Sequence, residues 1–326
     1  MRCISKLLCI IGAASLLVTG CGVQAPVELE KEYNAYTYFD SYLNSDSPTV
    51  TMDYYAADLC VTNPINFGLE GTYSYVAQGG GVFNVTTNEV LYNQNIFKKL
   101  YPASTTKILT AYIILRDCDL NAYATVSASA ADQDIDSSVC GLRAGDVISI
   151  KDLLYGLMLA SGNDAAEVLA EYHSGSAEAF AEVMTEEAHK LGATNSKFKN
   201  PSGLPDKEHY TTVYDMYLIF NEAIKNEEFV KIINTKKQNL VYTNKAGKRV
   251  EKTFSNGNRY LLGSEKIPNG FETVGGKTGT TYDAGYCLVL YTKNPDGEDI
   301  ISIVFKADCK HNLYLLMSQI LDKYAK

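Results

Sequence analysis

Continuous and periodic runs of apolar residues predict several buried elements along this chain. The apolar residues between Ile108 and Leu115 fall on every side of a helix, so this helix should run through the core. Residues 151–159 predict a second apolar helix. Two apolar runs joined by a turn, residues 284–291 and 300–305, predict a pair of buried strands. Helical spacing near the end of the chain predicts a last helix that buries Leu313, Leu316, Met317, Ile320 and Leu321.

These elements predict a single α/β (α+β) domain over residues 54–326, without an internal repeat. Residues 21–53 are rich in Tyr, Ser, Asn and Asp and lack a sustained apolar period, so we interpret them as a tether. The aromatic run at residues 32–38 allows a second interpretation, in which this segment docks onto the domain as an extra strand.

Residues 1–20 have the pattern of a secretory signal peptide. Arg2 and Lys6 precede an apolar stretch over residues 7–18, which is short of the ~20 residues that span a bilayer. The sequence Val-Thr-Gly-Cys at residues 18–21 resembles the lipobox of bacterial lipoproteins, in which the thiol is lipidated and the chain is cut before it. We therefore expect Cys21 to carry lipid. An ordinary signal peptide with an incidental cysteine is the alternative.

The composition narrows the range of partners. The chain has 326 residues, of which 46% are apolar, and this excludes disorder or a coiled coil as a description of the whole chain. The formal net charge of −9 argues against a nucleic-acid partner and against general binding to anionic membranes. The lipid on Cys21 is therefore expected to provide the membrane attachment.

Cysteine and histidine spacing indicates no metal or redox site. No CxxC pair occurs, and the histidines lack metal-ligand spacing, so they are expected at the surface or as caps: His173, His189, His209 and His311. The cysteines beyond Cys21 are odd in number, so at least one is free or pairs between molecules, and their pairing stays open: Cys60, Cys118, Cys140, Cys287 and Cys309.

Ser104 and Lys107 stand one helical turn apart at the start of the predicted core helix. This pair permits nucleophilic attack by the serine with the lysine as proton acceptor. A lysine ordinarily keeps its proton to about pH 10.4. A second cation at about 4 Å would disfavour the ammonium form by roughly 4 kcal/mol. The alternative is a purely structural role, in which Ser104 caps the helix and Lys107 extends toward solvent.

Ser161 and Asn163 fall in a tight turn between two predicted helices, with Asp164 and Glu167 spaced as a capping box for the second helix. The turn could present a hydroxyl for proton relay and an amide that binds a peptide carbonyl. Plain turn chemistry, with Gly162 at the bend, is the alternative.

The run from Gly276 to Thr278 resembles the end of a phosphate-binding loop, but Phe271 occupies the place of the first glycine and a strand hairpin follows. These departures argue against nucleotide binding. Glycines beside Lys277 on an edge strand would let an extended peptide pair with it. Lys277 and Thr278 could then meet a terminal carboxylate, and Lys277 is a candidate for the second cation near Lys107.

The order of these motifs, SxxK at Ser104, SxN at Ser161 and KTG at Lys277, resembles that of the penicillin-recognising serine enzymes. The runs Val-Leu-Tyr-Asn-Gln-Asn at residues 90–95 and Asn-Pro-Ser-Gly-Leu-Pro at residues 200–205 are similar to the low-molecular-mass D-alanyl-D-alanine carboxypeptidases. The likeness runs from about residue 54 to the end. It implies a β-lactamase/transpeptidase-like fold, with an antiparallel sheet flanked by helices and a helical subdomain.

The resemblance also implies roles. Ser104 would attack the D-alanyl-D-alanine carbonyl of a peptidoglycan stem peptide, Lys107 would take its proton, and Ser161 would relay a proton to the leaving D-alanine. The substrate would be held by Asn163, Lys277, Thr278, Gly279 and Thr280, with the amides of Ser104 and Thr280 as an oxyanion hole. Penicillins would acylate Ser104. The enzyme would need no cofactor and would be extracytoplasmic, attached to the bacterial membrane by lipid.

Departures from the family pattern keep two alternatives open. Serine β-lactamases of the SDN type have Asp where this chain has Gly162, and no Glu-x-x-Leu-Asn follows Asn163. A penicillin-binding lipoprotein without turnover is the other alternative, although every motif residue is present. Ser202 stands where His is expected, and Thr280 where relatives often have a larger residue; both could tune substrate choice.

Overall fold

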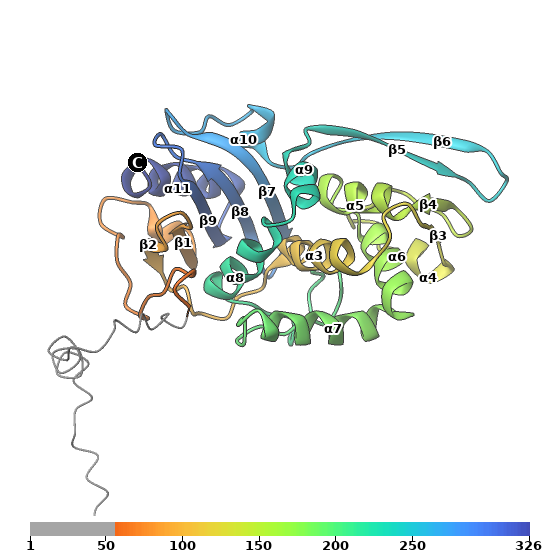
Figure 1. The fold of residues 1–326 in the computed structure, drawn as a ribbon, viewed down its shortest axis with the longest axis horizontal. Helices are drawn as coiled ribbons and strands as arrows, with labels where there is room; N and C mark the ends of the chain where they lie inside the picture. The colour runs from red at the N-terminus through yellow and green to blue at the C-terminus, as the bar shows by residue number, and fades with distance from the viewer. Residues whose placement is uncertain (1–55) are drawn as a thin grey trace, which may run out of the picture. The chain divides into compact units, whose positions relative to one another are not determined.

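A five-stranded antiparallel sheet forms one part of the molecule (Figure 1). The structure, a computed structural model, describes residues 56–326. The strand order is β2-β1-β9-β8-β7, so β7 lies at an edge. The strands are β1 (Gly79–Asn84), β2 (Glu89–Gln94), β7 (Glu272–Thr281), β8 (Gly285–Lys293) and β9 (Asp299–Ala307). The predicted hairpin is β8 and β9, and Lys277 lies on an edge strand as expected.

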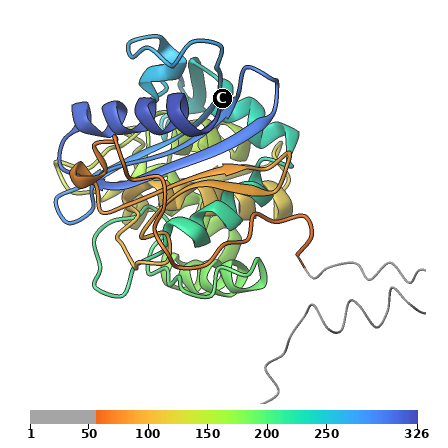
Figure 2. The same ribbon diagram turned by 90° about the vertical axis from the view of Figure 1, so that its left-hand side faces the viewer.

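Helices cover both faces of this sheet. Helix α11 (Lys310–Tyr324) packs on one face, and α8 (Val213–Ala223) packs against β1 and β9 on the other (Figure 2). The five apolar residues predicted for the last helix are buried in α11. The short elements η1 (Ser74–Val76) and α10 (Arg259–Leu262) complete this part.

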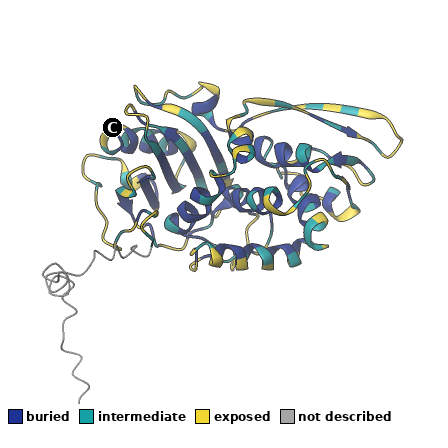
Figure 3. Ribbon diagram, in the orientation of Figure 1, coloured by how far each residue is buried: buried dark blue, intermediate teal, exposed yellow. Residues whose placement is uncertain are grey.

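A helical subdomain surrounds the predicted core helix. Helix α3 (Lys107–Asp117) follows the 3₁₀ turn η2 (Ala103–Thr106), and its first turn is entirely buried (Figure 3). The remaining helices are α4 (Ala128–Ala131), α5 (Ile150–Leu159), α6 (Asn163–Ser174), α7 (Ala177–Lys190) and α9 (Glu227–Asn234). Helices α5, α6, α7 and α9, together with α8, pack around α3, which explains why its apolar residues fall on every side.

A second, four-stranded sheet has the order β3-β4-β5-β6. Its strands are β3 (Tyr123–Thr125), β4 (Val147–Ser149), β5 (Lys237–Thr243) and β6 (Arg249–Ser255). This sheet was not predicted from the sequence, because β6 alternates between half-buried and exposed residues and carries few strongly apolar ones. Lys252 on β6 donates to the carbonyls of Cys140 and Gly141, and these hydrogen bonds connect the β5–β6 hairpin to the helical subdomain.

The predicted α/β class, with an antiparallel sheet, flanking helices and a helical subdomain, is confirmed. The predicted signal peptide, tether and lipidated Cys21 lie outside the described residues, so they and the boundary at residue 54 stay predictions. Among residues 56–326, no helix has the length and apolar character needed to cross a bilayer.

Candidate active site

Lys107 lies at the centre of a buried polar cluster between the two parts of the fold. Its side chain is fully buried, and its Nζ lies 3.1 Å from Ser104 Oγ. The 3₁₀ geometry of η2 explains this contact, because side chains three residues apart are eclipsed in such a turn. Nζ also donates to Asn163 Oδ1 at 2.8 Å and to the Ser202 carbonyl at 2.7 Å. Three separate segments of the chain therefore meet at this amine.

The surroundings of Lys107 favour the neutral amine. Burial, followed by the positive charge of Lys277, holds the pKa of Lys107 well below its usual range, while Cys140 and Asp164 act in the opposite direction. A second cation was the only cause of a lowered pKa expected from the sequence. That assignment was incomplete, since removal of the charged group from water is the larger cause.

The acceptors around Lys107 determine where a neutral amine points. Such an amine has two hydrogens and one lone pair, and neither the Asn163 amide oxygen nor the Ser202 carbonyl can donate. Both hydrogens are therefore directed to those oxygens. The lone pair is left facing Ser104 Oγ, in the position that proton transfer from the serine requires.

Lys277 occupies a similar buried position on the sheet edge. Only 3% of it is exposed, and its Nζ donates to Ser161 Oγ at 3.0 Å and to the Thr278 carbonyl at 2.9 Å. Burial lowers the pKa of Lys277 to about 7. Because Ser161 Oγ accepts from Lys277, the hydrogen of the Ser161 hydroxyl remains available for donation elsewhere.

The turn that carries Ser161 and Asn163 is held by Asp164. Its buried carboxylate accepts from the backbone amides of Cys140, Leu142 and Ala165 at 2.8–2.9 Å. The predicted capping box is wrong: helix α6 begins at Asn163 after the N-cap Gly162, so Asp164 lies inside the first turn, where it binds the amide of Ala165 and two amides of a neighbouring loop. Ser161 has a φ of +57°, an unfavourable conformation that the surrounding contacts must maintain.

Gly279 allows β7 to approach the serine segment directly. A Cβ at this position would lie 2.9 Å from the Ser104 nitrogen and 3.0 Å from the Pro102 carbonyl oxygen. Any side chain would therefore separate the strand from η2. The backbone amide of Ser104 thus lies beside β7, one residue from Thr280.

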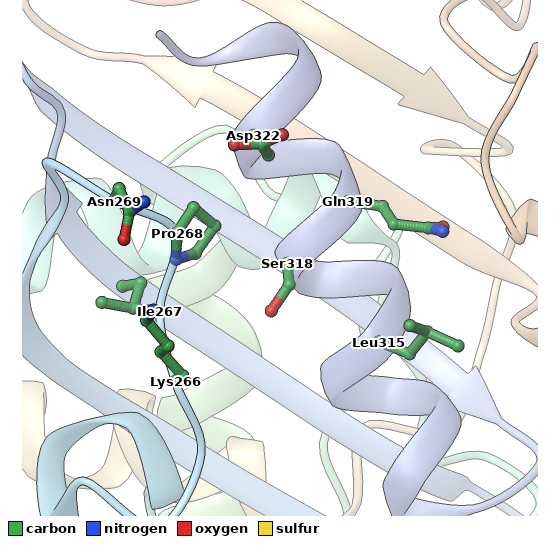
Figure 4. Close-up of a pocket in the computed structure, with 8 residues that line it drawn as sticks. All are labelled: Lys266, Ile267, Pro268, Asn269, Leu315, Ser318, Gln319 and Asp322. Atoms are coloured by element: carbon green, nitrogen blue, oxygen red, sulfur yellow. The ribbon is translucent and has the colours of Figure 1, made fainter.

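A cavity of about 240 Å³ opens next to these groups. Its lining includes Ser161, Lys277, Thr278 and Thr280, together with Lys310 at the start of α11. Two lysines and no carboxylate line this space, which favours an anionic group in the ligand. Figure 4 shows a separate hollow of about 360 Å³ between residues 266–269 and α11, which includes none of the predicted site residues.

Two features of the site were not foreseen from the sequence. The Ser202 carbonyl binds Lys107 through the main chain, so the residue type gives no signal, although the run at residues 200–205 marked the segment. His209 was expected at the surface or as a cap, but only 1% of it is exposed, and it contacts Thr106 within the SxxK segment.

The remaining potential ligands and thiols add no second centre. Within residues 56–326, His, Cys, Asp and Glu side chains form no cluster of three that could hold a metal ion. The cysteines of this part of the chain are all free thiols: Cys60, Cys118, Cys140, Cys287 and Cys309. Burial raises the pKa of Cys287, which lines the cavity, to about 12.

Comparison with known proteins shows the family of this chain. The sequence profile of the D-alanyl-D-alanine carboxypeptidases matches residues 75–309. The chain belongs to the D-alanyl-D-alanine carboxypeptidase family. Similar carboxypeptidases are DacF of Bacillus subtilis, 33% identical over 72% of this chain and 59% of DacF, and an enzyme of a Streptomyces species, 32% identical over 70% of this chain and 80% of that enzyme.

A solved structure supports the fold of this carboxypeptidase-family chain. The DD-transpeptidase of Streptomyces K15 superposes with a TM-score of 0.70 at 28% identity, covering 80% of this chain and 98% of that one. The β-lactamase/transpeptidase-like fold inferred from the motifs is therefore confirmed. The match to DacF spans less than two thirds of the length of that relative.

Proposed function

We propose that this protein is a serine D-alanyl-D-alanine carboxypeptidase that removes the terminal D-alanine from peptidoglycan stem pentapeptides. The observation that carries the proposal is the hydrogen bonding of Lys107, whose two other oxygen acceptors leave its lone pair for Ser104. A buried neutral lysine so oriented is a base within 3.1 Å of a nucleophile, an arrangement that suits acyl transfer.

In the proposed reaction, Ser104 Oγ attacks the carbonyl carbon between the last two D-alanines while Lys107 Nζ takes the serine proton. The amides of Ser104 and Thr280 stabilise the oxyanion. The proton held by Lys107 is relayed through the Ser161 hydroxyl to the nitrogen of the leaving D-alanine, which restores both Lys107 and Ser161, and Lys277 supports the Ser161 oxygen. Water then attacks the acyl group on Ser104, releasing a tetrapeptide and restoring the serine.

The cavity supports a substrate that ends in a free carboxylate. Lys277 and Lys310 supply positive charge, and Thr278 and Thr280 supply hydroxyls on the strand beside Ser104. Gly279 keeps β7 directly beside the Ser104 amide, so an extended peptide that pairs along the edge of β7 would reach the nucleophile, and Asn163 would bind the substrate backbone. Penicillins present a similar carboxylate and carbonyl, so we expect them to acylate Ser104 and to be released slowly.

We also propose an extracytoplasmic location, with the protein attached to the bacterial membrane through lipid on Cys21. The support is the sequence of residues 1–21, with two cations, a short apolar stretch and a lipobox-like end. Residues 1–20 would be removed as a signal peptide, and residues 21–53 would be a tether for the catalytic domain at residues 54–326.

The proposed activity can be tested with the chain lacking residues 1–21. D-Alanine release from diacetyl-L-Lys-D-Ala-D-Ala is measured beside labelling by a fluorescent penicillin, for wild type and Ser104→Ala. We expect release and labelling from the wild type alone, with the label mapped to Ser104. Release by folded Ser104→Ala would contradict the mechanism, and label without release would indicate a binding protein or a different peptide substrate.

A further inference from the structure

His209 is a buried histidine that the proposed reaction does not use directly. It lies where the polypeptide returns from the loop at residues 200–205, and its ring packs edge-on against Phe198. Its Nε2 lies 2.9 Å from Thr106 Oγ1, and its Nδ1 lies 3.2 Å from the backbone nitrogen of Lys199. Thr106 stands between Ser104 and Lys107 in the SxxK motif, so His209 contacts the motif from behind.

The contacts of His209 define its tautomer. A backbone N–H can only donate, so Nδ1 must carry a lone pair toward Lys199. In the neutral ring the hydrogen is then on Nε2, which donates to Thr106 Oγ1. Burial lowers the pKa of His209 to about 4, with a smaller contribution from Lys107 and an opposing one from Asp206. The imidazole of His209 is therefore neutral at pH values near 7.

Together with the main chain, these hydrogen bonds form a closed circuit of contacts around Lys107, which we call the hydrogen-bonded ring. From Lys107, the ring passes through the Ser202 carbonyl, back along the main chain to Lys199, across His209 to Thr106, and returns to Lys107. Thr110 Oγ1 binds the Pro201 carbonyl at 2.7 Å and adds a second attachment between α3 and the same loop.

The backbone also brings the loop and η2 into direct contact. Gly203 has a φ of +86°, and a Cβ there would lie 1.9 Å from the Ala103 carbonyl oxygen and 2.9 Å from Thr106 Oγ1. No side chain separates the two segments at this point. A displacement of Thr106 would therefore be transmitted to the Ser202 carbonyl.

We propose that His209 and Thr106 are positioning residues, which hold the Ser202 carbonyl against Lys107 and thereby direct its lone pair at Ser104. The inference rests on the proposed function, since it assigns a purpose to the orientation of Lys107. A reacting group that is misplaced by about 1 Å loses up to about 100-fold in rate. The ring prevents such a displacement without touching the substrate.

The test compares Thr106→Val with Thr106→Ser and measures stopped-flow acylation by a fluorescent penicillin. Valine keeps the shape but removes the acceptor of His209, so we expect acylation to slow by about 10- to 100-fold. The concentration for half-saturation should be unchanged, because Ser161, Lys277 and Thr280 lie outside the ring. Thr106→Ser keeps the hydroxyl and should remain within about threefold of wild type.

Thr211→Val is the matched control. Thr211 is also fully buried and lies two residues from His209, and its hydroxyl bonds Ser196 Oγ at 2.7 Å, outside the ring. It should lose thermal stability while keeping the wild-type acylation rate. Equal slowing of Thr211→Val and Thr106→Val would assign the effect to general loosening and overturn the proposal. Wild-type acylation by folded Thr106→Val would also overturn it.

Nitrogen-15 NMR of His209 in the wild-type protein tests the hydrogen-bonded ring without any variant. We expect the neutral tautomer with hydrogen on Nε2 at pH 7. Hydrogen on Nδ1, or a charged imidazole, would contradict the inference even where Thr106→Val fails to fold. If wild-type Ser104 is not acylated, the proposed function fails and the inference fails with it. Normal wild-type acylation with an unaffected Thr106→Val defeats the positioning role alone.

Discussion

The regions around Lys107 and Lys277 each bury a lysine side chain, but the two lysines have different surroundings. Lys107 lies within the helical subdomain, between two oxygens that cannot donate and one serine hydroxyl. Lys277 lies on the open edge of the sheet, beside Ser161 and the cavity. The turn between α5 and α6 serves both, since Ser161 contacts Lys277 and Asn163 contacts Lys107.

This difference shows that burial alone does not assign a role to a lysine. Burial is the largest cause of the lowered pKa in both cases. Only Lys107 has acceptors that direct its lone pair at a nucleophile. Lys277 instead faces a space where a ligand carboxylate would favour its charged form. The proposed roles follow this difference, with proton abstraction at Lys107 and carboxylate binding at Lys277.

The largest expected effect is that of Lys107→Ala. Removing the base should slow acylation of Ser104 by penicillin by about 1,000-fold or more. Mass spectrometry of the intact protein over time measures this rate, with circular dichroism as the check on folding. Near-normal acylation of the folded variant would show that another group is the base, and the comparison between the two lysines would collapse.

A smaller effect is expected from the titration of Lys277. Its pKa of about 7 means that the free enzyme loses this charge as the pH rises through neutrality. Because the charged form is proposed to bind the substrate carboxylate, kcat/KM for the tripeptide should fall at alkaline pH, approaching about tenfold per pH unit.

Lys277→Arg is the control for this decline. Arginine stays protonated throughout the range, so the variant should be slower overall but should lose the alkaline decline. The measurement is the pH profile of D-alanine release from pH 6 to pH 9. An identical decline in Lys277→Arg would assign it to another group.

The smallest effect is expected from Ser202→Ala. Lys107 contacts the main-chain carbonyl of this residue, and the hydroxyl bonds only Asn200 Oδ1, at 3.2 Å. Acylation should therefore stay within about threefold of wild type. Asn163→Ala provides the contrast, since it removes a side-chain acceptor of Lys107 and should slow acylation more. A large loss in Ser202→Ala would mean that the hydroxyl itself takes part.

Much of the fold could be predicted because its strongest signals are local. The all-round apolar α3 and the apolar runs of β8 and β9 can be buried in few ways. The β5–β6 hairpin escaped prediction because its residues alternate between half-buried and exposed, and its stability depends on distant partners such as the carbonyls bound by Lys252.

The candidate site divides in the same way. The spacing of Ser104 and Lys107 was enough to expect their contact, and the order of the motifs indicated that Lys277 would lie nearby. The Ser202 contact involves a carbonyl that every residue carries, so no sequence pattern marks it. His209 was expected at the surface or as a cap because a lone histidine has no spacing to interpret. Its burial depends on packing with Phe198 and Thr106.

The position of β7 at the edge of the sheet also bears on solubility. An unpaired strand edge can recruit the edge of another copy and begin aggregation. Here α9 limits the open length: Asn234 Nδ2 binds the Val274 carbonyl, and Gly275 lies directly against Ile233. The stretch left uncovered by α9 begins near Lys277 and is only a few residues long. The proposed pairing of a peptide end would use this stretch, and its short length limits the edge that a second copy could join.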